Sequence, residues 1–128
     1  MLDLDNFKEV NDTFGHYVGD LILKELGGKL AEFTKEFKNY HMIRLGGDEF
    51  LIYIKDEIST NKIQKILNKK LSNWDTNINE IKLTSSNGAY KFAAEKINNF
   101  NILYQKTDEL LYQAKEQGKN CFIYNDNE

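Results

Sequence analysis

The spacing of apolar residues along the chain predicts several amphipathic helices. Between residues 19 and 37, apolar side chains recur every three or four positions, which places them on one face of a helix. The same spacing recurs over residues 63–74 and 103–114, and Gly118 is placed to end the last of these helices. A shorter helix is expected over residues 5–11, before a turn at Gly15, because Asp5 is a residue type that caps helix N-termini.

Short apolar runs predict strands between these helices. They occupy residues 1–4, 41–45, 50–54, 81–89 and 121–124. Gly46-Gly47 separates the second and third runs and suits a tight hairpin turn. Because the chain has no proline, no low-complexity segment and no repeat, we expect one mixed α/β (α+β) domain over residues 1–128.

Composition narrows the classes of partner and compartment. The chain has seventeen Lys and Arg and twenty Asp and Glu, which gives a net charge of -3. This charge disfavours a nucleic acid polymer as a binding partner, but it does not disfavour a small phosphorylated ligand. With Cys121 as the only cysteine, an intrachain disulfide is excluded. No apolar run approaches the roughly 20 residues that span a bilayer. We therefore expect no membrane contact and a cytoplasmic location, including the cytoplasmic part of a larger membrane-attached protein.

Asp3 and Asp5 end the first predicted strand, where alternation puts both carboxylates on one face. An EF-hand is excluded, because Phe7, Lys8 and Phe14 stand where its loop needs an oxygen ligand, a glycine and a carboxylate. Asp3 suits either a metal ligand or a solvated strand end. Asp5 is interpreted first as a helix cap.

Asp48 and Glu49 follow the double glycine directly, so on a strand they point to opposite faces and only one would join Asp3. A surface acidic pair is the alternative. Two acidic strand ends side by side would hold hard cations for phosphoryl chemistry. Since neither common glycine-rich phosphate loop occurs, the candidate phosphate-binding cations are Lys8, Lys115 and Lys119, which could also simply keep helix faces soluble.

Four blocks of sequence, in order, cover nearly the whole chain. They are DLDNFK at 3–8 with Asn11-Asp12, Gly15-His16 and Gly19-Asp20; RLGGDEF at 44–50; residues 84–89; and Asp108, Leu111-Tyr112, Ala114-Lys115 and 118–120. Together they resemble the signatures of GGDEF domains, the catalytic domains of diguanylate cyclases. The resemblance implies an adenylyl-cyclase-like, palm-type fold with a central, mainly antiparallel five-stranded sheet flanked by helices.

The resemblance also implies a reaction: two GTP molecules condense into cyclic di-GMP and two pyrophosphates, for bacterial second-messenger signalling. Two Mg²⁺ or Mn²⁺ ions per active site would be held by Asp3, the Leu4 carbonyl and Asp48, with Glu49 as a further acidic group beside them. Asp48 would assist as a base.

The nucleotide contacts carried over from the family involve two sets of residues. Asn11 and Asp20 would bind guanine. The Asp20 carboxylate can accept hydrogen bonds from the N1-H and the exocyclic amine of guanine, a donor pattern that adenine lacks. The phosphates and the charge that develops on the leaving group would be held by the Phe7 backbone, Lys8, Lys115 and Lys119.

This chain departs from the family pattern in four places. The family usually carries a helix and a D-x-L-T-G-L-x-N-R segment before the first strand, so we expect a fragment with exposed apolar surface and lower activity. Phe37 and Tyr40 replace an inhibitory R-x-x-D pair, which predicts no product inhibition by that route. Lys119 replaces a usual arginine, and Asn87 interrupts an apolar strand position without a sequence-based explanation.

Joining two substrates requires two subunits, so an isologous homodimer is expected at least transiently, with a sensor or receiver domain upstream in the full-length protein. Two other functions are considered. One is a catalytically silent GTP-binding regulatory module, and the other is a plain α/β interaction domain. The intact motif at residues 46–50, with Asp3 and Asn11, favours the enzyme, because a binding module has no chemical need for both metal-binding acids.

Overall fold

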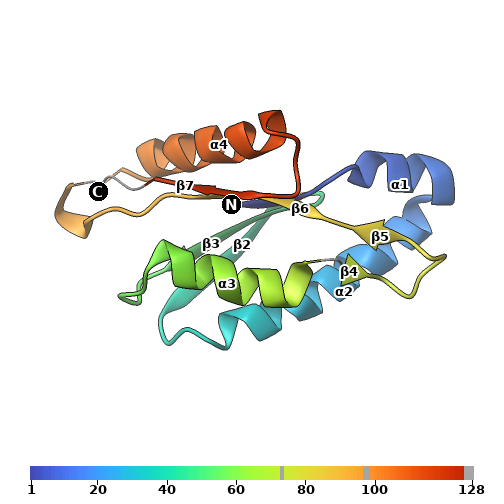
Figure 1. Cartoon of the computed structure of the whole chain (residues 1–128), viewed down its shortest axis with the longest axis horizontal. Coiled ribbons are helices and arrows are strands. Elements are labelled where there is room, and N and C mark those ends of the chain that lie inside the picture. The colour runs from blue at the N-terminus through green and yellow to red at the C-terminus, as the bar shows by residue number, and fades with distance from the viewer. Residues whose placement is uncertain (73, 97–98, 126–128) are drawn as a thin grey trace.

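Five strands form the central sheet of the protein, a computed structural model that describes residues 1–72, 74–96 and 99–125. The strand order is β2-β3-β1-β6-β7, and every neighbouring pair is antiparallel except the parallel pair β6–β7 (Figure 1). The strands are β1 Leu2–Leu4, β2 Tyr40–Gly46, β3 Glu49–Ile54, β6 Ser85–Ala89 and β7 Phe122–Tyr124. The expected mainly antiparallel five-stranded sheet is confirmed.

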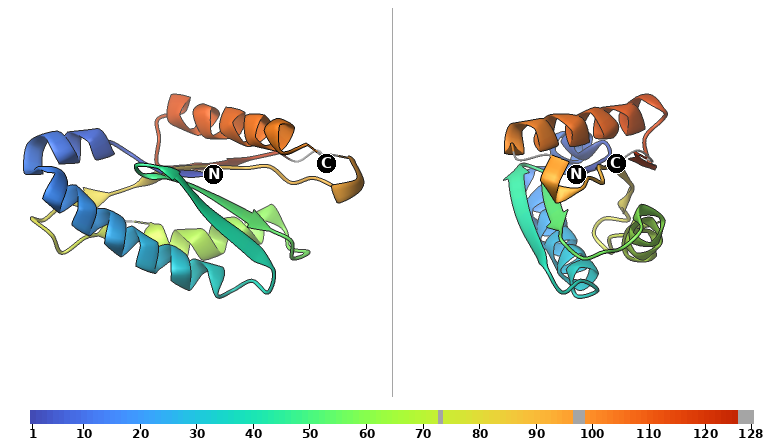
Figure 2. Two further views of the ribbon diagram at one scale, coloured as in Figure 1. Left: turned by 180° about the vertical axis from the view of Figure 1, so that it is seen from behind. Right: turned by 90° about the vertical axis from the view of Figure 1, so that its left-hand side faces the viewer.

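Helices cover both faces of this sheet. They are α1 Phe7–Phe14, α2 His16–Thr34, α3 Thr60–Leu71 and α4 Phe100–Glu116, with a short 3₁₀ turn at Ala94–Lys96. Helices α2 and α3 lie on one face and α4 lies on the other, while α1 projects from the end of β1 (Figures 1 and 2). None of the helices in the described ranges combines the length and apolar character needed to cross a bilayer.

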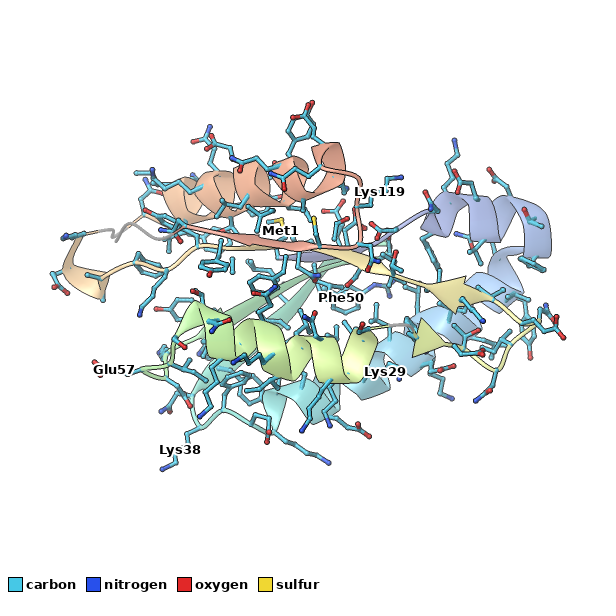
Figure 3. The ribbon with its side chains drawn as sticks, viewed as in Figure 1. Met1, Lys29, Lys38, Phe50, Glu57 and Lys119 are labelled. Carbon is cyan, nitrogen blue, oxygen red and sulfur yellow. The ribbon has the colours of Figure 1, made fainter. Side chains whose placement is uncertain are left out.

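The main core lies between the sheet and helices α2 and α3. Ile22, Leu26 and Leu30 of α2 are fully buried, as the helical spacing predicts. They pack with Leu2 of β1 and Phe50 of β3, and Figure 3 shows Phe50 pointing from the sheet into this layer. Each such side chain contributes about 1.5–3 kcal/mol when it is fully buried.

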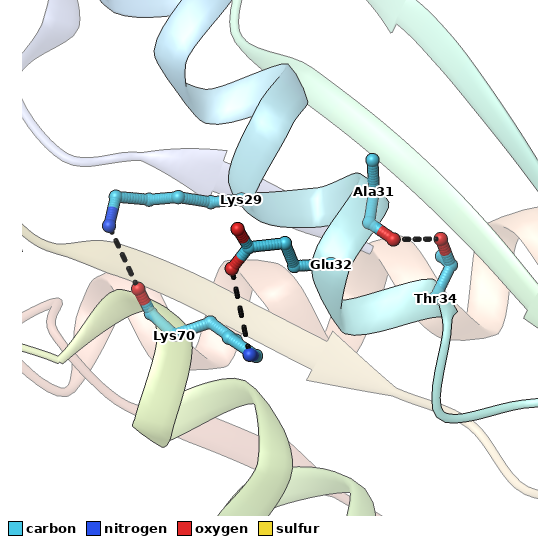
Figure 4. Close-up of polar contacts among 5 residues, drawn as sticks. All are labelled: Lys29, Ala31, Glu32, Thr34 and Lys70. Carbon is cyan, nitrogen blue, oxygen red and sulfur yellow. Dashed lines mark hydrogen bonds and ion pairs between the residues drawn. The ribbon is translucent and has the colours of Figure 1, made fainter.

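Polar contacts join α2 to α3 beside the core (Figure 4). The Lys29 ammonium donates to the Lys70 carbonyl at 3.4 Å, and Lys70 pairs with Glu32 at 3.6 Å. On α2 itself, the Thr34 hydroxyl donates to the Ala31 carbonyl at 3.0 Å. The Lys70–Glu32 pair is partly solvent-exposed, so it adds at most about 1 kcal/mol, and apolar burial dominates this contact.

Three predicted element boundaries are corrected. Helix α2 begins at His16 rather than Gly19, directly after Gly15, whose φ of 90° breaks the helical path from α1. The third predicted helix ends at Leu71, and Trp74 lies in a separate hairpin of β4 Trp74–Asp75 with β5 Lys82–Leu83. The strand predicted over 81–89 is therefore two strands, β5 and β6, that pair with different partners.

Candidate active site

Three acids converge where β1 meets the β2–β3 hairpin. Asp3 of β1 lies directly opposite Glu49 of β3 in the sheet. Asp48 precedes Glu49 in the tight turn, which the Arg44 Nε–H stabilises by donating to the Gly47 carbonyl at 2.9 Å. Because Asp48 lies in the turn, strand alternation does not apply to it. Of the two acids, Asp48 is the one that shares a hydrogen bond with Asp3.

The pKa of the Asp48 carboxyl is raised to about 7. Burial is the largest cause, followed by the hydrogen bond and negative charge of Asp3, with a smaller repulsion from Glu49. An acid with this pKa exchanges its proton near neutral pH. A carboxyl whose pKa is raised by burial and by a neighbouring carboxylate is characteristic of sites that bind cations or transfer protons.

Lys115 of α4 brings a cation to the acids by pairing with Asp3. Partial burial lowers the pKa of Lys115, but the hydrogen bond and charge of Asp3, with the charges of Glu49 and Asp48, outweigh it and raise the pKa above its ordinary value. Lys115 therefore stays charged at neutral pH. Its position fits the predicted role of binding an anion next to the acids.

One carboxylate oxygen of Asp3 is left available for a further group. Asp3 is only 7% exposed, and one of its carboxylate oxygens, Oδ1, is buried without a hydrogen-bond partner. An unpaired buried carboxylate oxygen is costly unless a further group meets it. Among the described residues, no three acidic, histidine or cysteine side chains form a complete metal cage. Mg²⁺ needs only one or two carboxylates when substrate phosphates complete its octahedron.

Asp5 does not cap the following helix, and that interpretation was wrong. The N-cap of α1 is Asn6, in the left-handed region at φ 60°. The Asp5 carboxylate is buried instead and accepts three hydrogen bonds: from the Thr84 hydroxyl at 2.6 Å, the Ser86 hydroxyl at 2.5 Å and the Asn120 N–H at 2.9 Å. Asp5 therefore ties β1 to β6 and to the turn after α4, and its oxygens are already engaged.

The turn after α4 places Lys119 beside the start of α1 (Figure 3). Its ammonium donates to Asn6 Oδ1 at 2.8 Å, one residue before Phe7. Phe7 and Leu4 both bury their side chains in the core, so only their backbone groups could face a ligand. Lys8 is exposed on α1, and within the described ranges it forms no ion pair with the acids.

One of the two residues predicted to bind guanine lies where α1 packs on α2, and the other lies in α2 itself. Asn11 of α1 lies against Gly19 of α2, and Asp20 is the next residue. Asp20 also lines a recess of about 400 Å³. The other lining residues are Leu23, Lys24, Gly27, Arg44 and Phe50. Arg44 was not singled out beforehand as a site residue, although it stands inside the RLGGDEF block.

Two family departures gain a structural explanation. Asn87 is buried, and its side-chain amide donates to the Ser85 hydroxyl at 3.1 Å and the Cys121 carbonyl at 3.3 Å, so it fastens β6 to the start of β7. Phe37 is a core residue that packs edge-on against Phe33 at 5.1 Å between ring centroids. Its position therefore serves packing in this chain.

Comparisons with known proteins agree with this geometry. The family model "Diguanylate cyclase, GGDEF domain" matches residues 1–121. Diguanylate cyclase DgcS of Shewanella oneidensis is 34% identical over 122 residues, which are 95% of this chain and 40% of DgcS. The chain thus spans about two fifths of the length of DgcS and of diguanylate cyclase DgcZ of Escherichia coli.

Solved structures share the fold. A shortened TpbB (YfiN) of Pseudomonas aeruginosa comprising only the GGDEF domain superposes with a TM-score of 0.79 at 22% identity, covering 96% of this chain and 73% of that one. The GGDEF domain of DgcB from Caulobacter crescentus, in complex with c-di-GMP, gives 0.75 at 20% identity, covering 96% and 74%. The solved structures show the same fold, and the family model over residues 1–121 shows that the chain belongs to the GGDEF family.

Proposed function

We propose that this domain is a diguanylate cyclase, which condenses two GTP molecules into cyclic di-GMP. The observation that carries the proposal is the cluster of Asp3, Asp48 and Lys115. It combines a buried unpaired carboxylate oxygen, an acid of raised pKa and a fixed cation at one strand end. Relatives named diguanylate cyclases, and a structural neighbour in complex with c-di-GMP, support the same reaction class.

The reaction places distinct demands on these residues. The 3′-oxygen of one GTP forms a bond to the α-phosphorus of the other, the bond from that phosphorus to the pyrophosphate oxygen breaks, and the hydroxyl proton leaves. Asp48 is suited to accept this proton because its pKa lies near neutrality. Two such transfers close the ring and release two pyrophosphates.

Two divalent cations, Mg²⁺ or Mn²⁺, would be held by Asp3, Asp48 and the Leu4 carbonyl beside Glu49, and would supply electrophilic stabilisation of the phosphate oxygens. Lys115, which pairs with Asp3, and Lys119, which donates to Asn6, would hold the triphosphate together with Lys8 and the Phe7 backbone N–H. Once phosphate and cation are bound, Lys115 would exchange its contact with Asp3 for the phosphate. Asn11 and Asp20 would bind guanine.

The reaction also requires two chains. One chain presents one set of these groups, whereas each turnover joins two nucleotides, so the productive unit is a two-fold dimer with a GTP on each subunit. We propose that a sensor or receiver domain in the full-length protein brings the two chains together.

A paired-variant rate assay tests the proposed function. Pyrophosphate release from GTP and Mg²⁺ is measured for the wild type, Asp48→Asn and Glu57→Gln, an exposed acid at the other end of the molecule (Figure 3). We expect Asp48→Asn to lower the rate at least about 100-fold, because both the proton acceptor and a cation ligand are lost. Glu57→Gln should retain the wild-type rate. Equal rates for the two variants would contradict the proposal.

A further inference from the structure

Gly19 is buried in the first turn of α2, where it packs against Asn11 and Phe7 of α1. A Cβ atom added to it would overlap Asn11 Oδ1, lie 3.0 Å from Asn11 Cγ and lie 3.3 Å from Phe7 Cζ. The Phe7 contact could relax by a small ring shift. The Asn11 overlap is too close for a small shift, so any residue other than glycine would force the Asn11 amide to rotate to another position.

Backbone conformation does not explain glycine at this position. Gly19 has no positive φ and lies within a regular helix, where alanine is favoured over glycine by about 1 kcal/mol. Gly27 and Gly28 of the same helix have open space around their Cα atoms. Unlike these two glycines, Gly19 leaves space that the side chain of Asn11 occupies.

The Asn11 amide is held in place but left unpaired. Within the described part of the chain, no hydrogen bond engages its side-chain oxygen or nitrogen, although the residue is half-buried. Packing against the Gly19 backbone thus sets where this free donor and acceptor lie, one residue before Asp20 in α2. Such a preorganised amide binds a base edge at a low cost in conformational entropy.

We propose that Gly19 is the positioning residue for guanine recognition, because its missing side chain seats the Asn11 amide where it reads the base. This inference rests on the proposed function, in which Asn11 and Asp20 bind the guanine of GTP. Gly19 itself makes no contact with the nucleotide.

The test measures base discrimination rather than activity. Dissociation constants for α,β-methylene GTP and α,β-methylene ATP, which cannot release pyrophosphate, are obtained by calorimetry with Mg²⁺. Gly19→Ala should lower the preference for guanine about tenfold, the loss of about one hydrogen bond to the base. Gly28→Ala, an exposed position in the same helix, should leave the preference unchanged.

Two further variants separate positioning from packing. In Asn11→Ala, adding Gly19→Ala should cause no further loss of preference, because the displaced side chain is already absent. Asn11→Gln keeps Gly19 but carries the amide one methylene further out, and it should lose preference to the same extent as Gly19→Ala. This second variant also decides the matter if Gly19→Ala fails to fold.

The outcomes distinguish the positioning role of Gly19 from guanine recognition by Asn11. Equal weakening of both nucleotides by Gly19→Ala, with the preference retained, would overturn the positioning role and leave guanine recognition by Asn11 standing. If Asn11→Ala kept the wild-type preference for guanine, both the positioning role of Gly19 and guanine recognition by Asn11 would be overturned. An undiminished preference in Asn11→Gln would likewise overturn the positioning role.

Discussion

The proton on Asp48 couples the stability of this domain to pH. Between about pH 4 and about pH 7 the folded chain keeps this proton, because burial and Asp3 raise its pKa to about 7, whereas the unfolded chain has lost it. The folded state therefore binds more protons over this window. The Asp48 contribution to the free energy of unfolding falls as the pH rises through it.

Thermal unfolding in EDTA checks this pH dependence. We expect the difference in melting temperature between the wild type and Asp48→Asn to shift against the wild type as the pH rises from about 4 to about 7. Adding Mg²⁺ should reverse the shift by stabilising the ionised carboxylate. A difference that stays constant across the window would show that the environment of Asp48 does not raise its pKa.

Asp5 is the second residue with a distinct prediction. Replacing it with alanine leaves the Thr84 and Ser86 hydroxyls and the Asn120 N–H without their acceptor in a buried region. We expect Asp5→Ala to lower the free energy of unfolding by about 3 kcal/mol. Asp12→Ala, at an exposed site on α1, is the matched control for urea denaturation. Equal midpoints for the two variants would contradict the linking role of Asp5.

At the scale of elements, α4 packs on β6 through a glycine. A Cβ atom on Gly88 would overlap the Leu111 backbone nitrogen and lie 2.8 Å from the Leu110 carbonyl carbon. Backbone atoms cannot rotate away, so Gly88→Ala should push α4 off the sheet and destabilise the fold by about 1–3 kcal/mol. Gly27→Ala meets open space and should not destabilise α2. Denaturation midpoints that do not separate the two variants would refute this packing argument.

Much of the order of helices and strands could be predicted, because the spacing of apolar residues shows which face of each element is buried. The stripe on α2 and the hairpin around Gly46-Gly47 are both observed. The split of the strand over 81–89 could not be predicted, because the chain changes partners from β4 to β1 around Thr84, where no glycine or proline marks a break. Pairing partners are set by tertiary contacts that local pattern does not encode.

Only part of the candidate site could be predicted, because local sequence shows residue types but not the partners that the fold brings to them. Asp3, Asp48 and Lys115 stand out as residue types at strand and helix ends, and the structure brings them together. Asp5 was misinterpreted because its helix-capping propensity is local, whereas its three donors come from residues 84, 86 and 120. Gly19 carried no local signal, since its role depends on the approach of another helix.

At the scale of the whole molecule, one chain supplies one set of the proposed nucleotide-binding groups. If two chains are needed for each turnover, the rate per mole of protein should rise with protein concentration until dimers predominate. Initial rates of product formation over a hundredfold range of concentration provide the measurement. A rate per mole that is constant down to concentrations at which ultracentrifugation finds only monomers would contradict the two-chain requirement.

The identity of the nucleotide product tests the central claim most directly. The chain is incubated with GTP and Mg²⁺, and the products are separated by chromatography and weighed by mass spectrometry. Our account predicts cyclic di-GMP from the wild type and none from Asp48→Asn. Bound but unchanged GTP with the wild type, or cyclic di-GMP in equal amounts from Asp48→Asn, would contradict it.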